Sequence, residues 1–146
     1  MQGVYNIADL RALAKKRLPR GLFEYVDRGS EDERALANNR EALARVKLRP
    51  RVLRDVGERQ LQTMLFGKTN QMPLAISPTA VAGMLWYDGE VEAAKAAKAA
   101  GIPFTLSTVG ICSPEEVRAA SGAPFWFQLY MLRDRGAVVS LLERAA

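Results

Sequence analysis

The sequence predicts an α/β fold, namely the N-terminal part of a (β/α)8 TIM barrel that follows a helical extension and a short β-hairpin. Strand and helix patterns alternate three times from residue 73 onwards, which is typical of a parallel α/β fold. The strand segments are apolar throughout, as expected when both faces of a sheet are covered. A complete barrel takes roughly 250 residues, so the barrel is expected to be incomplete within these 146 residues.

Residues 1–50 are expected to form the helical extension. Asn6 can cap a helix over residues 7–17, whose apolar side chains recur with the spacing of one helix face. Pro19 ends this helix and can begin a second one, for which Gly29 is a suitable end. The spacing therefore predicts two short consecutive helices at the start of the chain.

A third helix is expected over residues 31–45, because Ser30 and Glu33 have the spacing of a capping box. The helical pattern does not continue into residues 51–72, which are expected to form a short hairpin or linker. Their apolar residues suggest two short strands around a turn at Gly57.

Residues 73–146 are expected to form the first three βα units of the barrel. Ser113 and Pro114 give the clearest helix start, since a cap is followed by proline at the first helical position and by Glu116 at the third. The chain ends without a glycine stop and is expected to end in or just after a helix. The segments expected, in chain order, are strands over 73–77, 103–107 and 125–130 and helices over 88–100, from 114 and from 134.

Composition is that of a soluble globular protein, with 49% hydrophobic and 25% charged residues. No apolar run approaches the roughly 20 residues of a membrane-spanning helix, no secretory pattern is present, and Cys112 is the only cysteine, so a cytoplasmic location is expected. The net charge of +5 is densest over residues 40–54, without interleaved aromatics or a binding motif. This indicates a solvated surface rather than a nucleic-acid interface, with attraction to the inner face of the membrane as an alternative. No metal site is expected.

Polar or conformationally special residues follow each of the three strands. In a β/α barrel, functional groups lie at the carboxyl ends of the strands, so these residues are expected to share one rim. Gln128 is the hardest to explain structurally, because an amide inside an apolar strand must find polar partners. Together they predict a ligand pocket. The residues are Pro78, Thr79 and Ala80, then Ser107, then Gln128 and Tyr130.

The motifs, taken in order, resemble those of the FMN-dependent 2-hydroxy-acid dehydrogenases and oxidases. This family includes glycolate oxidase, mandelate dehydrogenase and the flavin-linked L-lactate dehydrogenases. The resemblance extends over essentially the whole chain. Its segments are Leu18-Pro19 with Tyr25, Gly29–Asp32, Asn39-Arg40, Arg49–Arg51 with Asp55-Val56, Pro78–Ala80, Ala100-Gly101 and Phe127–Tyr130.

The resemblance implies that FMN is the cofactor and that the complete enzyme oxidises an L-2-hydroxy acid, such as L-lactate, to the 2-oxo acid by hydride transfer to flavin N5. It implies that the backbone over 78–80 borders the flavin ring and that Ser107 and Gln128 bind its polar edge. Tyr25 would donate a hydrogen bond to the substrate carboxylate. Tyr130 would act as the catalytic residue of this chain by binding the substrate hydroxyl and stabilising its developing charge.

The chain contains no histidine, the usual base for such chemistry. The resemblance implies that the base, an arginine for the carboxylate, a lysine near flavin N1 and the phosphate site all lie later in such enzymes. The chain alone is therefore expected to be inactive and to need the C-terminal remainder of the barrel, and the complete enzyme is expected to be a homo-oligomer. The alternative is a non-catalytic half-barrel that acts through self-association or a C-terminal partner, since exposed strand edges favour association.

Overall fold

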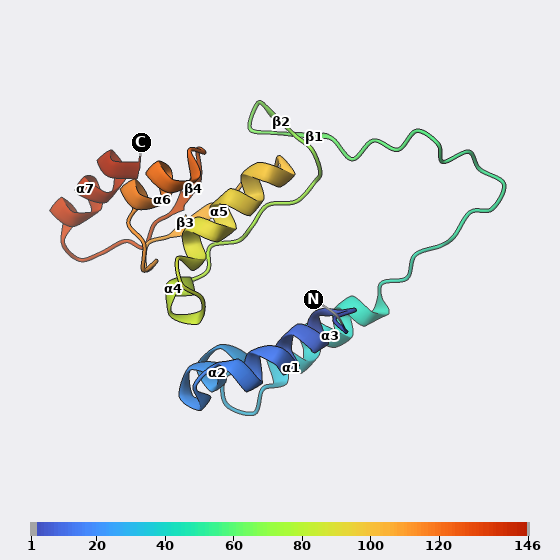
Figure 1. Cartoon of the computed structure of the whole chain (residues 1–146), viewed down its shortest axis with the longest axis horizontal. Helices are drawn as coiled ribbons and strands as arrows, with labels where there is room; N and C mark the ends of the chain where they lie inside the picture. Colours follow the sequence, from blue (N-terminus) through green and yellow to red (C-terminus); the bar gives the residue numbers. More distant parts are fainter. Residues whose placement is uncertain (1–2, 146) are drawn as a thin grey trace. The chain divides into compact units, whose positions relative to one another are not determined.

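The computed structural model describes residues 3–145 (Figure 1). The chain divides into two compact units, an N-terminal unit Met1–Gly57 and a C-terminal unit Glu58–Ala146. The N-terminal unit is helical, and the C-terminal unit combines short strands with helices. Within the described residues, no helix is both long enough and apolar enough to cross a membrane.

The N-terminal unit contains the three helices that the sequence predicted, α1 (Ile7–Arg17), α2 (Arg20–Asp27) and α3 (Arg34–Arg45). The Asn6 side chain accepts a hydrogen bond from the Asp9 N–H at 3.0 Å, which confirms the predicted cap of α1. This cap is decided locally, because donor and acceptor lie three residues apart.

The start of α3 differs from the prediction, because the capping box from Ser30 is not formed. The helix begins after Glu33, which has a left-handed backbone with φ of 56° and makes no side-chain cap. Its Oε1 instead accepts from the Gly29 N–H at 3.2 Å, and its own N–H donates to the Ser30 carbonyl at 2.9 Å. Glu33 is therefore engaged in closing the preceding turn, which prevents the reciprocal bonds of a capping box.

The hairpin of the C-terminal unit consists of β1 (Thr63–Leu65) and β2 (Lys68–Asn70), which pair antiparallel. Its turn is at Phe66 and Gly67, so the prediction of a turn at Gly57 is wrong. The two turn residues have φ of 49° and 75°. A two-residue hairpin loop with positive φ at both positions matches the twist of the strands, and glycine is the residue that most readily adopts this conformation.

The second sheet of the C-terminal unit, which follows the hairpin, is parallel. Ile76 forms a single parallel bridge with Phe104, so the strand predicted over 73–77 is reduced to one bridge. The next strand, β3 (Thr105–Ser107), pairs in parallel with β4 (Trp126–Gln128). The carboxyl ends of all three segments therefore lie at the same edge of the sheet.

Helices alternate with these strands, and the buried core lies between them. The helix α5 ends at Gly101 as predicted, and α6 begins with the predicted capping box between Ser113 and Glu116. A short helix, α4, was not predicted, and it precedes α5. The helices are α4 (Ala82–Leu85), α5 (Gly89–Ala100), α6 (Pro114–Ser121) and α7 (Arg135–Ala145). The core side chains are Val91, Ala94, Ala97, Phe104, Leu106 and Val117.

A buried carboxylate joins two of the loops that follow the strands. Glu90, on α5, is only 2% exposed, and its Oε1 accepts from the Ile111 N–H at 2.9 Å. A Cβ at Gly83 would lie 3.0 Å from Glu90 Oε2 and 2.8 Å from Ile111 Cβ, so this approach requires glycine. Burial acts to raise the pKa of Glu90, but the N–H groups of Ile111, Glu90 itself and Gly83, with the Cys112 thiol, hold it below its ordinary value.

Burial and the neighbouring Glu90 keep the Cys112 thiol protonated. Burial, followed by the hydrogen bond and the charge of Glu90, raises the pKa of Cys112 to about 11. Since the thiolate is the nucleophile, we expect iodoacetamide to alkylate Cys112 much more slowly at pH 8 in the folded chain than in urea. Glu90→Gln should speed alkylation of the folded chain, whereas Glu92→Gln, at an exposed glutamate two residues later, should not. Equal rates in the folded and unfolded wild-type chain would contradict this.

The exposed Glu115–Arg144 pair joins α6 to α7. Arg144 Nε and Nη2 donate to the two Glu115 oxygens at 2.6 and 2.8 Å. These bonds are the main reason that the pKa of Glu115 falls from 4.5 to about 2. A depressed pKa means that the contribution to folding is fully present above 4.5 and is lost as the pH falls through about 2. We expect an NMR titration to show this value, and Arg144→Gln to raise it towards 4.5. Arg118→Gln should leave it unchanged.

Candidate functional site

Two of the predicted site residues meet at the carboxyl edge of the sheet. Ser107 ends β3 and lies directly opposite Gln128, which ends β4. The Ser107 hydroxyl donates to Gln128 Oε1 at 3.1 Å, and Ser107 is 5% exposed. The structure therefore brings these two side chains together, and their assignment to a flavin stays a prediction.

The hydrogen bonds around this pair leave donors available. The Ser107 hydroxyl also accepts from the Val109 N–H at 3.3 Å, so it is used as both donor and acceptor. The Gln128 Nε2 group makes no hydrogen bond within residues 3–145, so both of its N–H donors are free. The polar edge of a flavin ring carries carbonyl oxygens beside an N–H group. A half-buried amide with free donors fits such an edge.

Pro78, Thr79 and Ala80 follow Ile76 and lie at this same end of the sheet. The segment is joined to the loop after β3, because the Val81 N–H donates to the Val109 carbonyl at 3.0 Å. Pro78 and Thr79 are exposed, and Ala80 is half-buried. These residues are therefore at least partly exposed at the carboxyl end of the sheet, and their place beside a flavin ring stays a prediction.

Tyr130 is held at this edge by a residue to which the sequence analysis gave no role. The Thr108 hydroxyl accepts from the Tyr130 N–H at 3.1 Å and donates to the Gln128 carbonyl. Tyr130 itself is 55% exposed, so its phenol can be reached from solvent. The sequence signal for Thr108 was weak, since a second hydroxyl after a strand-end serine is common in turns.

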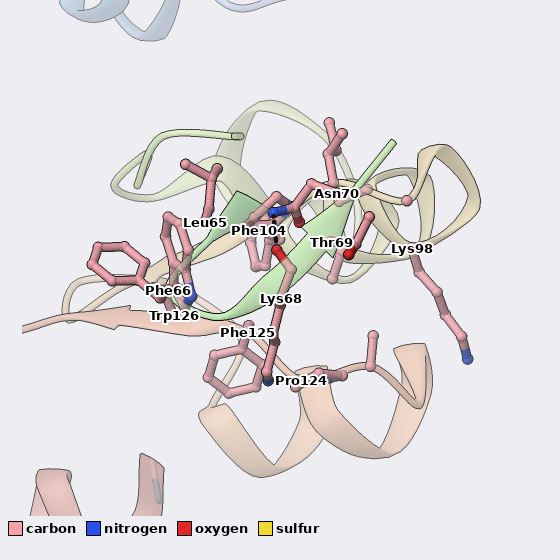
Figure 2. Close-up of a pocket in the computed structure, with 16 residues that line it drawn as sticks. Leu65, Phe66, Lys68, Thr69, Asn70, Lys98, Phe104, Pro124, Phe125 and Trp126 are labelled. Carbon is pink, nitrogen blue, oxygen red and sulfur yellow. Dashed lines mark hydrogen bonds between the residues drawn. The ribbon is translucent and has the colours of Figure 1, made fainter. Parts of the chain in front are cut away.

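A cavity in the C-terminal unit lies at the opposite end of the sheet from this rim. It measures about 450 Å³ and is bordered by the hairpin, by α5 and by the amino ends of β3 and β4 (Figure 2). Phe66 and Trp126 meet there edge to face, with ring centroids 5.4 Å apart. Most of the remaining lining is apolar. In β/α barrels this amino end serves stability, whereas reactions occur at the carboxyl end.

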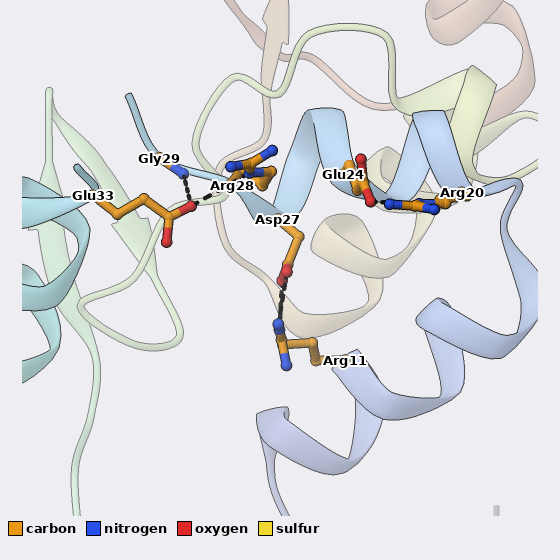
Figure 3. A network of polar contacts seen from close by, with 7 residues as sticks. All are labelled: Arg11, Arg20, Glu24, Asp27, Arg28, Gly29 and Glu33. Atoms are coloured by element: carbon orange, nitrogen blue, oxygen red, sulfur yellow. Dashed lines mark hydrogen bonds and ion pairs between the residues drawn. The ribbon is translucent and has the colours of Figure 1, made fainter. Parts of the chain in front are cut away.

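Tyr25 belongs to the N-terminal unit, where it lies on α2 and is 70% exposed. Ion pairs stabilise its helix (Figure 3). Within α2, Arg20 Nε donates to Glu24 at 2.7 Å. Arg11, on α1, binds both oxygens of Asp27, and this is the main reason that the pKa of Asp27 lies below its usual range. Tyr25 is thus presented to solvent on an anchored helix, and its role stays a prediction.

No group of histidine, cysteine, aspartate or glutamate within residues 3–145 is arranged to hold a metal ion. The strand ends bring together the Ser107 hydroxyl and the Gln128 carboxamide, and the Thr108 hydroxyl binds the backbone of Tyr130 beside them. These groups donate and accept hydrogen bonds.

Comparison with known proteins identifies the family to which this chain belongs. The sequence model of the family described as FMN-dependent dehydrogenase matches residues 14–146. The chain is 50% identical over 143 residues to the L-lactate dehydrogenase of Caulobacter vibrioides, covering 98% of this chain and 37% of that protein. It is 53% identical over 137 residues to the L-lactate dehydrogenase of Vibrio parahaemolyticus, covering 94% and 36%. The chain thus spans little more than a third of the length of these curated relatives.

The fold is shared with solved structures. A soluble mutant of the membrane-associated (S)-mandelate dehydrogenase from Pseudomonas putida matches with a TM-score of 0.91 at 38% identity, covering 98% of this chain and 41% of that one. This likeness confirms the predicted fold class, part of a TIM barrel. The family match extends over both units, including the strand ends with Ser107 and Gln128. The chain therefore belongs to the FMN-dependent dehydrogenase family.

Proposed function

We propose that this chain supplies the rim that faces flavin and substrate in an enzyme that oxidises an L-2-hydroxy acid, with L-lactate as the first candidate, to the 2-oxo acid. The observation that carries the proposal is the Ser107–Gln128 pair, which places free amide donors at the carboxyl edge of a parallel sheet. The two L-lactate dehydrogenase relatives, at 50% and 53% identity, support the choice of substrate.

FMN is the cofactor of this family. In the proposed site, the Gln128 amide and the Ser107 hydroxyl hold the polar edge of the ring, and the backbone of Pro78, Thr79 and Ala80 borders it. Bound FMN supplies the hydride acceptor, N5. The residues of this chain hold the ring in position against the substrate, and correct positioning of the reacting groups lowers the barrier to reaction.

The substrate contacts are assigned to two exposed tyrosines. The Tyr130 phenol donates a hydrogen bond to the substrate hydroxyl oxygen and stabilises the negative charge that develops there. Tyr25 donates to the substrate carboxylate. Their exposure, 55% and 70%, supports this assignment, because a side chain that binds substrate must be reachable.

The proton acceptor is proposed to come from outside this chain, since the 146 residues contain no histidine. The partner is the C-terminal remainder of the barrel, and the complete enzyme is a homo-oligomer. Support for a partner comes from large apolar side chains that the C-terminal unit leaves exposed at the strand ends and on α7. They include Leu74, Met131, Leu132, Val139 and Leu142.

A cytoplasmic location at the inner face of the membrane is proposed for the complete enzyme. The P. putida (S)-mandelate dehydrogenase is described as membrane-associated, which supports attachment in this family. The basic stretch over residues 40–54 would favour an anionic surface.

The proposal can be tested in a chimera in which this chain replaces the matching segment of the C. vibrioides enzyme. We expect the chimera to bind FMN and to reduce a dye when L-lactate is added. Gln128→Leu should weaken FMN binding roughly tenfold, as expected for the loss of a net hydrogen bond. The control Gln60→Leu, at an exposed glutamine, should not. A flavin-loaded chimera that oxidises no L-2-hydroxy acid would contradict the activity, and unchanged FMN affinity in Gln128→Leu would contradict the site.

The isolated chain should be inactive with L-lactate and added FMN. A general base alone contributes roughly 10²–10⁴-fold to such a reaction, and the arginine that pairs with the substrate carboxylate is also proposed to come from outside this chain. Dye reduction by the purified 146-residue chain is compared with that of the chimera at equal concentration. Turnover by the chain alone above the rate of free FMN would show that the base lies within it.

A further inference from the structure

We infer that Thr108 is a positioning residue that sets the place of Tyr130, and this inference rests on the proposed function of Tyr130. The Thr108 side chain joins the end of β3 to the backbone beyond the end of β4.

The contacts of Thr108 bracket the residue before Tyr130. Its backbone N–H donates to the Gln128 carbonyl at 3.0 Å, and its hydroxyl donates to the same carbonyl. The hydroxyl oxygen then accepts from the Tyr130 N–H at 3.1 Å. One hydroxyl group therefore fixes the peptide groups on both sides of Leu129.

This bridge matters because the strand pairing stops at this point. The β3–β4 ladder ends with Ser107 opposite Gln128, so regular pairing no longer holds the chain that leads to Tyr130. The hydroxyl of Thr108 continues the connection for one more peptide. It thereby relates Tyr130 to the same strand ends that carry the Ser107–Gln128 pair.

Threonine is suited to this task by its stiffness. Its branched Cβ restricts χ1, so the hydroxyl stays in one direction relative to a backbone that β4 already anchors. Valine has nearly the same shape but no hydroxyl, and it would leave the Tyr130 N–H without this partner. Serine would keep the hydroxyl and lose part of the stiffness.

The test compares three variants in the chimera described above. Thr108→Val should lower kcat for L-lactate roughly ten- to a hundredfold, the range expected when a catalytic group is displaced by about 1 Å. KM and FMN content should change little. Thr108→Ser should restore most of the kcat. The matched control Thr105→Val, at a threonine hydroxyl with no hydrogen bond in the described part of the chain, should leave kcat unchanged.

A double-mutant cycle separates positioning from a general loss of structure. If Thr108 acts through the Tyr130 phenol, Thr108→Val should have little further effect on kcat once Tyr130→Phe is present. Additive effects of the two substitutions, or a Thr108→Val variant with wild-type kcat, would overturn the inference. A fall in FMN content that accounts for the whole fall in kcat, together with a lower melting temperature, would also overturn it.

Amide hydrogen exchange distinguishes failure of this inference from failure of the proposed function. The Tyr130 amide should exchange slowly in the wild-type and Thr108→Ser chimeras and clearly faster in Thr108→Val. If the wild-type chimera oxidises no hydroxy acid, the proposed function fails, and this exchange difference still decides whether Thr108 holds the Tyr130 backbone. Equal exchange in all three proteins would overturn the inference.

Discussion

The register in which β3 pairs with β4 is the constraint on which the candidate site depends. Ser107 and Gln128 are neighbours only because the two strands are parallel and in this register. A slip of one residue would turn one of the two side chains to the other face of the sheet. Leu106, which precedes Ser107, packs with the core residues of α5 and α6. Burial of Leu106 between the helices and the sheet therefore directs Ser107 to the opposite face.

The loops that follow the strands are held together by polar contacts. The Val81–Val109 hydrogen bond joins the loop after Ile76 to the loop after β3, and the buried Glu90 carboxylate binds the second of these through Ile111. Backbone N–H groups, rather than a cation, keep this carboxylate charged. The Thr108 hydroxyl connects the segment after β4 to these loops, because it accepts a hydrogen bond from the Tyr130 N–H. The rim is thus a connected layer whose parts come from three strands.

The two ends of the sheet carry different side chains. The amino end is apolar and meets the hairpin through Phe66 and Trp126. The carboxyl end presents a hydroxyl, an amide with free donors and an exposed phenol. These hydrogen-bonding groups are the reason that we propose the carboxyl end as the site of flavin and substrate. The cavity of about 450 Å³ at the other end, which is lined mainly by apolar side chains, lies away from the proposed site.

The sequence by itself determined the features in which donor and acceptor lie within a few residues of each other. The cap at Asn6, the capping box from Ser113 and the end of α5 at Gly101 all follow from such local bonds. The same reasoning failed at Ser30, where Glu33 closes the preceding turn, and at Gly57, where a two-residue turn at 66–67 forms the hairpin instead.

The alternation of strands and helices also fixed the α/β class and the edge at which the site residues collect. The tertiary structure alone decided how those residues touch. Ser107 and Gln128 are 21 positions apart, and Thr108 and Tyr130 are 22 apart, so their hydrogen bonds exist only after the strands have paired. Residue type and spacing can suggest such partners, but the hydrogen bond between them depends on a strand register that long-range packing selects.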